Sequence, residues 1–316
     1  MKRKVLLLCL LLGCIGGLLT ACGKGSSATE IRLGSDGARV SGPAKASVRT
    51  TADSVTITRA GNYHITGAAK MQLIVEVESG KAVYLTLDGI DLTCDSSAPL
   101  YVKKASMVVL NLAAGSQNTI TDRHLYTEIA EQNNSMQTDP DSLAENPSAA
   151  IYSRSPLLIQ GEGKLTVNAE SYNGISTNDT FTMKSGNLTV SSVMHGIKGK
   201  DYVVISGGNL ILRCEEGDGI KATNTERPEL GYLNITGGNV TINCGDEGLY
   251  APSSISISGG NLSIKSKKTA LLTSGTLNLS GGIIELRTNN PPLSAAQKTV
   301  SPSVLITVNG RPYAQQ

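Results

Sequence analysis

The sequence has no tryptophan, one phenylalanine and three histidines among its 316 residues. The histidines, His64, His124 and His195, lie in unrelated segments, and no cysteine or histidine pair has the spacing of a zinc site. Gly-x-Ser-x-Gly, His-Glu-x-x-His and phosphate-loop motifs are also missing. These absences argue against zinc enzymes, serine hydrolases and nucleotide-binding proteins.

An excess of one charge is missing as well. The chain has 28 Lys and Arg residues and 26 Asp and Glu residues, and three of the basic ones, Lys2, Arg3 and Lys4, open the sequence. Without these three the chain is close to neutral, which argues against a nucleic-acid partner. A carbohydrate ligand is compatible with this balance but is not implied by it.

What the chain does contain is a repeat. A Gly-Gly or Ser-Gly pair followed by alternating apolar residues recurs at spacings of 22, 30, 22 and 22 residues, with an insertion in the long interval near 223–230. A fixed period of this size is typical of a stacked solenoid. The repeats begin at Ser185, Gly207, Gly237, Gly259 and Gly281.

The units alternate apolar and polar residues, which is the period of β-strands. They have neither the helix pattern nor the Asn-punctuated Leu pattern of leucine-rich repeats. Aligning them on the glycines gives five aliphatic columns, one of which contains Leu188, Leu210, Val240, Leu262 and Ile284. The sequence therefore predicts an all-β fold, a parallel β-helix with coils of about 22 residues that rise about 4.8 Å each.

The N-terminus has the features of a bacterial lipoprotein signal. Its basic start is followed by an apolar run over 5–19, and Cys22 directly follows Leu-Thr-Ala. An uncleaved anchor helix is the alternative, although the apolar run is short for one. We expect a signal peptide over 1–21 and a lipidated Cys22 that anchors the chain to the outer face of the cell membrane.

The remaining domain boundaries follow from composition and periodicity. We expect a flexible tether over 22–46, a β-helix over 47–290 and a C-terminal end segment over 291–316. A polar, acidic stretch over 122–147 departs from the repeat, and it is either a ligand-binding loop or disordered.

Two cysteines occupy the same repeat position. Cys214 and Cys244 each lie six residues after the second glycine of a repeat, so they should stack on adjacent coils. That separation allows a disulfide, but a column that also holds Ser192, Ser266 and Thr288 is explained equally by small buried residues.

Acidic residues gather at one predicted turn. Asp218 aligns with Glu247, and Asp246 and Glu216 are close in sequence, so carboxylates should lie about 5 Å apart on adjacent coils. A calcium ion could bridge them, because Ca²⁺ binds oxygen ligands at about 2.3–2.6 Å. Two solvated side chains are the alternative.

A second acidic pair follows from the same alignment. Asp179 and Asp201 both lie seven residues before the second glycine, so they should also stack. Lys198, Lys200 and Lys221 lie near these turns. A second calcium site and a salt-bridge network are both possible.

Tyrosine is the abundant aromatic residue, so it is the candidate for contact with sugar rings. Tyr202 and Tyr232 share an outward repeat position and should form a ladder, while Tyr250 falls near the acidic turn. The coil spacing is similar to the length of one sugar unit, so a polysaccharide could lie along the rod. Ordinary exposed tyrosines are the alternative.

These features together resemble a family of bacterial surface lipoproteins, the calcium- and carbohydrate-binding β-helix proteins of cellulolytic clostridia. The resemblance covers roughly 48–288 and rests on the order and spacing of several short stretches. They are 57–67 (ITRAGNYHITG), 85–92 (LTLDGIDL), 112–122 (LAAGSQNTITD), 148–153 (SAAIYS), 161–167 (GEGKLTV), 195–201 (HGIKGKD) and 218–221 (DGIK).

The resemblance implies a single right-handed, pectate-lyase-like β-helix that binds calcium and a polysaccharide, either cellulose or acidic pectic chains. It also implies that Asp218, Asp201 and Asp179 stand at acidic positions beside the family's turns. The match is incomplete, because Met194 and His195 stand where the family often has two aspartates, and Lys267 and Lys268 replace acidic residues in a later coil.

We therefore expect a non-catalytic, calcium-dependent polysaccharide-binding protein, monomeric, with Lys198 and Lys221 beside the sugar. A structural surface rod or adhesin is one alternative. A polysaccharide lyase with Lys198 or Lys221 as its base is another.

Overall fold

The structure is a computed structural model that describes residues 28–78, 80–126 and 147–313. In this part of the chain nearly every regular element is a β-strand, and one 3₁₀ turn, η1 (Lys45–Ser47), is the exception. No helix among the described residues is long and apolar enough to cross a membrane. The predicted signal peptide, Cys22 and most of the 122–147 stretch lie outside the described residues.

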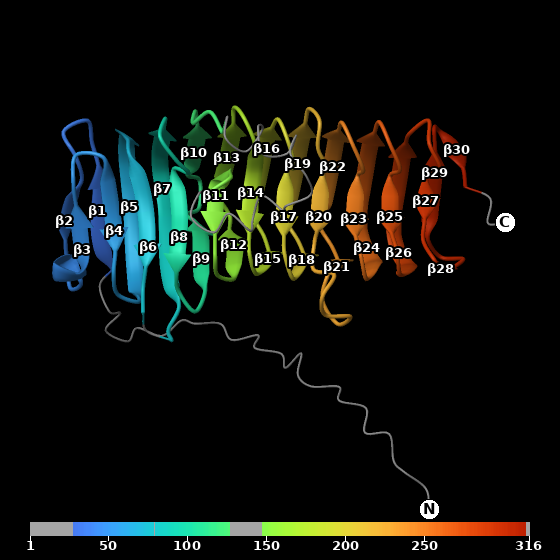
Figure 1. Cartoon of the computed structure of the whole chain (residues 1–316), viewed down its shortest axis with the longest axis horizontal. Helices are drawn as coiled ribbons and strands as arrows, with labels where there is room; N and C mark the ends of the chain where they lie inside the picture. Colours follow the sequence, from blue (N-terminus) through green and yellow to red (C-terminus); the bar gives the residue numbers. More distant parts are fainter. Residues whose placement is uncertain (1–27, 79, 127–146, 314–316) are drawn as a thin grey trace, which may run out of the picture.

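Among the described residues the strands form two sheets that run side by side along a rod (Figure 1). The small sheet has 11 strands: β3 (Val48–Thr50), β4 (Ser54–Ile57), β6 (Gln72–Glu76), β8 (Leu100–Lys104), β11 (Ala149–Ser153), β14 (Asn173–Thr177), β17 (Ile197–Gly199), β20 (Ile220–Ala222), β23 (Leu249–Ala251), β25 (Leu271–Thr273) and β27 (Leu293–Ser294).

The large sheet has 19 strands in the same part of the chain: β1 (Thr29–Leu33), β2 (Arg39–Ser41), β5 (Gly61–Lys70), β7 (Val83–Cys94), β9 (Val108–Leu112), β10 (Gln117–Asp122), β12 (Leu157–Gly161), β13 (Lys164–Ala169), β15 (Thr180–Met183), β16 (Asn187–Ser192), β18 (Tyr202–Ile205), β19 (Asn209–Cys214), β21 (Tyr232–Ile235), β22 (Asn239–Cys244), β24 (Ser254–Ser266), β26 (Thr276–Arg287), β28 (Gln297–Val300), β29 (Leu305–Val308) and β30 (Arg311–Pro312).

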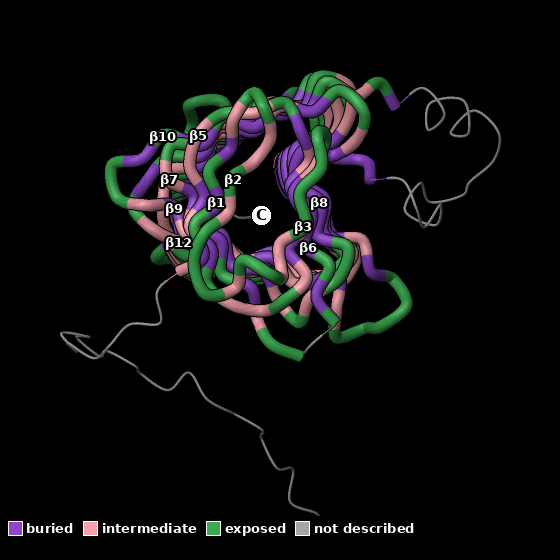
Figure 2. The backbone as a smooth tube through the Cα atoms, turned by 90° about the vertical axis from the view of Figure 1, so that its left-hand side faces the viewer, coloured by how far each residue is buried: buried purple, intermediate pink, exposed green. Residues whose placement is uncertain are grey.

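The chain winds as a β-solenoid, as predicted. After β19 it crosses to β20 in the small sheet and returns through β21 and β22, and each of these strands pairs in parallel with its counterpart one coil away. Viewed along the rod, the coils enclose one buried interior (Figure 2). The right-handed sense of the winding stays a prediction.

The predicted aliphatic columns are confirmed by the strand register. Leu188 pairs with Leu210, Leu210 with Val240, and Val240 with Leu262, so side chains one repeat apart are neighbours. All four are almost completely buried. Burying one large apolar side chain stabilises the fold by roughly 1.5–3 kcal/mol. This burial is the main force that holds the coils together.

The corner glycines of the repeat are required by the backbone. Gly238 has a φ of +89°, and a Cβ added there would lie 2.8 Å from the carbonyl oxygen of Gly208 in the preceding coil. A side chain is therefore excluded both by conformation and by the close approach of the two coils.

The solenoid extends beyond its predicted limits at both ends. Strands β1 and β2 fall within the stretch 22–46 that was expected to be a tether, and β1 pairs in parallel with β5 as part of the first coil. At the other end, β28 and β29 pair with β26 and continue the stack. The strands at both ends were missed because they are short and do not follow the repeat. At the N-terminal end, for example, β1 pairs with β2 in the antiparallel direction.

Candidate functional site

The turn from the large sheet to the small sheet carries a column of stacked polar side chains. Asn173, His195, Asp218 and Glu247 occupy equivalent positions on four successive coils. Each of the first three accepts a hydrogen bond from the backbone N–H of the next residue in the column. The distances are 3.1 Å from His195 N to Asn173 Oδ1, 2.9 Å from Asp218 N to His195 Nδ1 and 3.0 Å from Glu247 N to Asp218 Oδ1.

This column explains why a carboxylate can be buried here. Asp218 is only 1% exposed, and a buried polar group is tolerated when hydrogen bonds replace those it makes with water. The acceptor role of Asp218 toward Glu247 also brings the two acidic side chains together, as the repeat alignment predicts.

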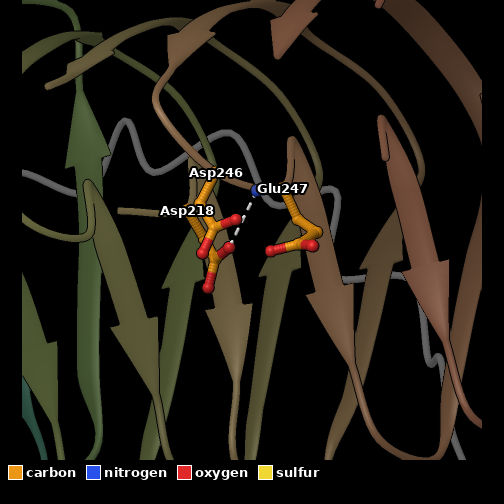
Figure 3. A group of neighbouring side chains, drawn as sticks. All are labelled: Asp218, Asp246 and Glu247. Atoms are coloured by element: carbon orange, nitrogen blue, oxygen red, sulfur yellow. Dashed lines mark hydrogen bonds between the residues drawn. The ribbon is translucent and has the colours of Figure 1, made fainter. Parts of the chain in front are cut away.

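Three carboxylates meet at this turn (Figure 3). One oxygen each of Asp218, Asp246 and Glu247 lies within 4.8 Å of the other two. Among the described residues this is the one group of three or more Asp, Glu, His or Cys side chains that gathers so closely. We call it the acidic cluster. Glu216, also predicted as a ligand, is exposed and lies outside the cluster.

Two lysines partly neutralise the acidic cluster. Lys221 Nζ lies 3.0 Å from Asp218 Oδ2, and Lys268 Nζ lies 2.5 Å from Asp246 Oδ1. Asp246 holds the pKa of Lys268 above its ordinary value through this contact. The cluster therefore carries one more acidic group than it has lysine partners.

Glu247 is the carboxyl group with no lysine partner among the described residues. Its partial burial, together with the neighbouring Asp246 and Asp218 carboxyls, raises its pKa to about 7. Three crowded carboxylates repel one another, and either a proton or a cation relieves this repulsion.

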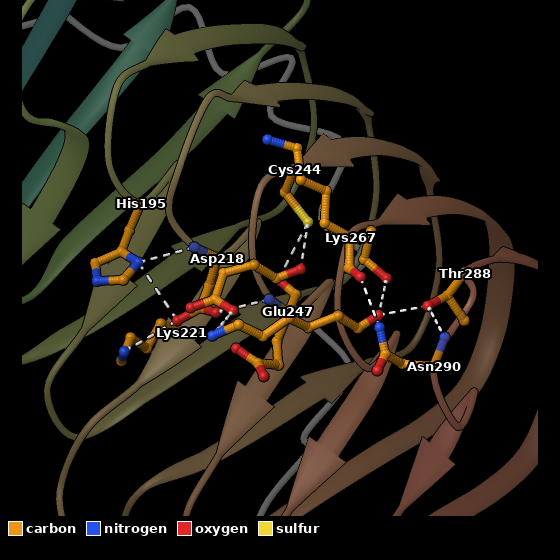
Figure 4. Close-up of polar contacts among 11 residues, drawn as sticks. His195, Asp218, Lys221, Cys244, Glu247, Lys267, Thr288 and Asn290 are labelled. Atoms are coloured by element: carbon orange, nitrogen blue, oxygen red, sulfur yellow. Dashed lines mark hydrogen bonds and ion pairs between the residues drawn. The ribbon is translucent and has the colours of Figure 1, made fainter.

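His195 adds no charge to the acidic cluster. Burial, followed by the charges of Lys221 and Lys198, holds its pKa well below the ordinary value. Its Nδ1 also accepts the N–H of Asp218, so it cannot carry a proton there (Figure 4). The 3.4 Å contact between Nδ1 and Asp218 Oδ2 is therefore not an ion pair near neutral pH.

The acidic cluster fits a calcium ion in its chemistry. Carboxylate oxygens are the ligands that Ca²⁺ prefers, and three of them converge from two adjacent coils. Lys268 is the replaceable partner, because its side chain is 61% exposed and can swing into solvent when a cation takes its place.

The second predicted acidic pair has a different environment. Asp179 and Asp201 do stack, with the N–H of Asp201 bonded to the carbonyl of Asp179 at 3.0 Å. The Asp201 carboxylate, however, accepts hydrogen bonds from Asn224 at 2.6 Å and Arg227 at 3.2 Å. The Asp179 carboxylate accepts the N–H of Thr180 at 2.8 Å. These protein groups contact three of the four carboxylate oxygens that a cation would use.

The predicted sugar-contacting residues fall on two different faces. Tyr202 and Tyr232 form a ladder on the large sheet, with ring centroids 4.8 Å apart and planes 14° from parallel. Lys198, Lys221 and Tyr250 are in register on the small sheet, where Lys221 Nζ lies 5.1 Å from the centroid of the Tyr250 ring. Lys198 is buried, so Lys221 and Tyr250 are the accessible pair beside the acidic cluster.

The cysteine column contains thiols and no disulfide in the described residues. Cys214 and Cys244 stand on adjacent coils, as predicted, and both are free and buried. Burial raises the pKa of Cys214 to about 11 and that of Cys244 to about 12. The Cys244 thiol donates to the carbonyls of Asp246 and Glu247 at 3.5 and 3.2 Å, so it supports the backbone of the acidic cluster.

Sequence reasoning missed an asparagine ladder at the Gly-Asn steps. Each amide nitrogen donates to the side-chain oxygen of the preceding member, at 2.8, 2.8 and 2.9 Å. The signal was present, because the asparagine recurs directly after the corner glycines. The members are Asn187, Asn209, Asn239 and Asn261.

Taken together, the fold and the site define a β-solenoid with an acidic cluster and tyrosines on its surface. Residues 51–311 match the family of carbohydrate-binding domain-containing proteins, so the chain belongs to this family. A carbohydrate-binding domain-containing protein of Acetivibrio thermocellus is 34% identical over 203 residues, which cover 64% of this chain and 67% of that protein.

A solved structure shares the fold. It is the gadolinium derivative of a polysaccharide lyase-like protein from C. thermocellum, with a TM-score of 0.72 and 33% sequence identity. The match covers 81% of this chain and 99% of that one.

Proposed function

We propose that this protein is a non-catalytic, calcium-dependent polysaccharide-binding lipoprotein of the bacterial surface, monomeric and wound as a single right-handed β-helix. The convergence of Asp218, Asp246 and Glu247 beside Lys221 and Tyr250 carries the proposal. Membership of the carbohydrate-binding family supports the class of ligand.

In this proposal the calcium ion joins the protein to the polysaccharide. Asp218, Asp246 and Glu247 hold Ca²⁺, which supplies positive charge for the carboxylates or hydroxyls of a sugar chain such as a pectic or cellulosic glycan. Tyr250 offers a ring face beside the ion, and Lys221 is placed to contact a sugar carboxylate.

Binding to insoluble polygalacturonate and cellulose tests the proposal. We expect more of the protein to sediment with at least one of them in calcium than in a chelator. Asp218→Asn and Glu247→Gln should each abolish the calcium-dependent part, whereas Asp53→Asn, an exposed carboxylate far from the turn, should not. Binding that ignores both the chelator and the two cluster variants would contradict the proposal.

A polysaccharide lyase is the second candidate, favoured by the description of the solved relative as lyase-like. A lyase would produce an unsaturated uronate with new ultraviolet absorbance, which is measured in the same mixtures. The surroundings of the two candidate bases oppose this function, because Lys198 is buried and Lys221 contacts Asp218.

A further inference from the structure

A groove runs along the rod over the ends of β13, β16, β19, β22 and β24. It has a volume of about 680 Å³ and is lined from five successive coils, which at about 4.8 Å per coil makes it about 19 Å long. One column of its lining holds only small side chains, whereas the interior column two residues earlier holds Val, Leu and Ile. The small residues are Ala169, Ser192, Cys214, Cys244 and Ser266.

One edge of the groove is an exposed polar column that follows the strand register. Arg213 pairs with Asn243, and Asn243 with Lys265, so the two basic groups stand two coils apart. Among the described residues neither Arg213 nor Lys265 takes part in an ion pair. Unlike Lys221 and Lys268, which each contact a carboxylate of the acidic cluster, these two cations can bind a ligand without leaving an ion-pair partner.

The residues on the other edge of the groove do not neutralise the positive charge of Arg213 and Lys265. Lys267 contributes a third cation, and Glu215 is the opposing carboxylate. Glu170, at the end of the groove, is ion-paired with Arg123 at 3.3 Å. The groove thus offers three basic side chains against one unpaired carboxylate.

We infer that this groove is a second, cation-independent binding site for a linear polysaccharide that carries a carboxylate on its sugar units. Sugar units about one coil long would place alternate carboxylates at Arg213 and Lys265, with the intervening unit against the Asn243 amide. Guanidinium and ammonium groups bind carboxylates through charge-assisted hydrogen bonds. The inference takes the class of ligand from the proposed function but uses none of its residues.

The two sites would act on the same chain type through opposite charges. The acidic cluster needs a cation between itself and an acidic sugar, whereas the groove attracts the sugar directly. The Cys244 thiol in the groove floor is bonded to the backbone of the acidic cluster, so one turn separates the two sites. A protein with both sites would keep part of its affinity when calcium is removed.

Titration with oligogalacturonates of two to eight units in excess chelator tests the inference. We expect affinity to rise with length up to about four or five units, the span of the groove, and then to level off. Binding should weaken with added salt, because the contacts are exposed ion pairs. Neutral cello-oligosaccharides of the same lengths should bind at least tenfold more weakly.

Variants locate the site. Arg213→Ala and Lys265→Ala should each weaken binding in chelator by up to about fivefold, and the double variant should lose most of it. Lys298→Ala removes an exposed lysine outside the groove and should change nothing. All these side chains are exposed, and a thermal melt confirms that the fold is kept.

The outcomes separate this inference from the proposed function. The groove proposal would be overturned if the wild type did not bind in chelator. It would also be overturned if the double variant Arg213→Ala, Lys265→Ala bound in chelator as tightly as the wild type. Asp218→Asn should remove the calcium-dependent part and spare the chelator-resistant part. If Asp218→Asn leaves binding in calcium unchanged while the groove variants weaken binding in chelator, the groove proposal is supported and the calcium site is contradicted.

Discussion

Asp218 is the residue on which both the fold and the site depend at this turn. Its Oδ1 accepts the N–H of Glu247 from the next coil, and its Oδ2 faces Lys221. The same carboxylate is one of the three that could hold a cation. A structural and a binding role are therefore combined in one side chain, and substitutions of different chemistry can separate them.

Asparagine and alanine at position 218 should differ in stability but not in calcium binding. Asp218→Asn keeps an oxygen acceptor for the Glu247 N–H, whereas Asp218→Ala leaves that buried N–H without a partner. We expect Asp218→Ala to be less stable than Asp218→Asn by about 1–3 kcal/mol in urea unfolding. Neither variant should be stabilised by calcium. Equal stability of the two would show that the hydrogen bond contributes nothing.

Glu247 should make the calcium-free protein less stable as the pH rises. Its pKa is raised from 4.5 to about 7 in the fold, so the folded state favours the protonated form. The resulting stabilisation is fully present below about pH 4.5 and is lost as the pH rises through about 7. Calcium, which binds the ionised form, should restore stability at pH 8.

Glu247→Gln is the control for this pH dependence. Subtracting its unfolding free energies from those of the wild type removes the contributions of other groups, such as Asp122, whose pKa is raised by burial to about 6. The unfolding free energy of the wild type minus that of Glu247→Gln should decrease as the pH rises from about 4.5 to 8. Curves that stay parallel over this range would contradict the assignment.

At the scale of single elements, the asparagine ladder ties the strands after the corner glycines to one another. Asn239 is an interior member with a bond on each side, and Asn261 is the last member with one. Asn239→Ala should cost about 1–2 kcal/mol and Asn261→Ala about half of that, because a net hydrogen bond contributes about 0.5–1.5 kcal/mol. Urea unfolding of both variants checks the ratio. Equal losses would mean that the amides act singly and not as a ladder.

The glycine before each of three short strands of the small sheet, β17, β20 and β23, allows the coils to approach closely. A Cβ on Gly219 would lie 2.4 Å from Ile242 Cγ2 and 2.6 Å from the carbonyl oxygen of Gly248. Gly219→Ala should destabilise the fold by about 1–3 kcal/mol, as overpacked cores do. It should also weaken calcium binding, since Gly219 follows Asp218 directly. Thermal melts with and without calcium measure both effects.

Gly80→Ala is the matched control for Gly219→Ala. A Cβ on Gly80 would meet no atom within 4 Å, so the substitution should leave both stability and calcium binding unchanged. A tolerated Gly219→Ala would show that the coils can separate locally without cost.

At the scale of the whole molecule, periodicity determined which features could be predicted from the sequence. Residues one repeat apart become neighbours, so the aliphatic columns, the Asp218–Glu247 contact and the Tyr202–Tyr232 ladder could all be derived from counting. The ion pairs of Lys221 with Asp218 and of Lys268 with Asp246 were not predicted, although Lys221 follows Asp218 by three residues and Lys268 follows Asp246 by one repeat. An alignment brings these residues close together but does not state which way a long side chain turns.

Features that interrupt the period also escaped prediction. The β1–β2 cap pairs antiparallel and has no repeat to align with. The groove was also missed, because an alignment gives the residues of each column but not the shape of the surface that they line.

The last prediction concerns where the whole molecule is held. The solenoid begins at β1, and Cys22 precedes it in the sequence directly after Leu-Thr-Ala. If Cys22 is lipidated, the wild-type protein should incorporate labelled fatty acid and sediment with membranes of a bacterial host, while Cys22→Ala should do neither. Because the predicted calcium and sugar ligands are all far from Cys22 in the sequence, calcium and polysaccharide binding of the purified variant should be unchanged. Membrane association that persists in Cys22→Ala without fatty-acid label would instead indicate an uncleaved apolar N-terminus as the anchor.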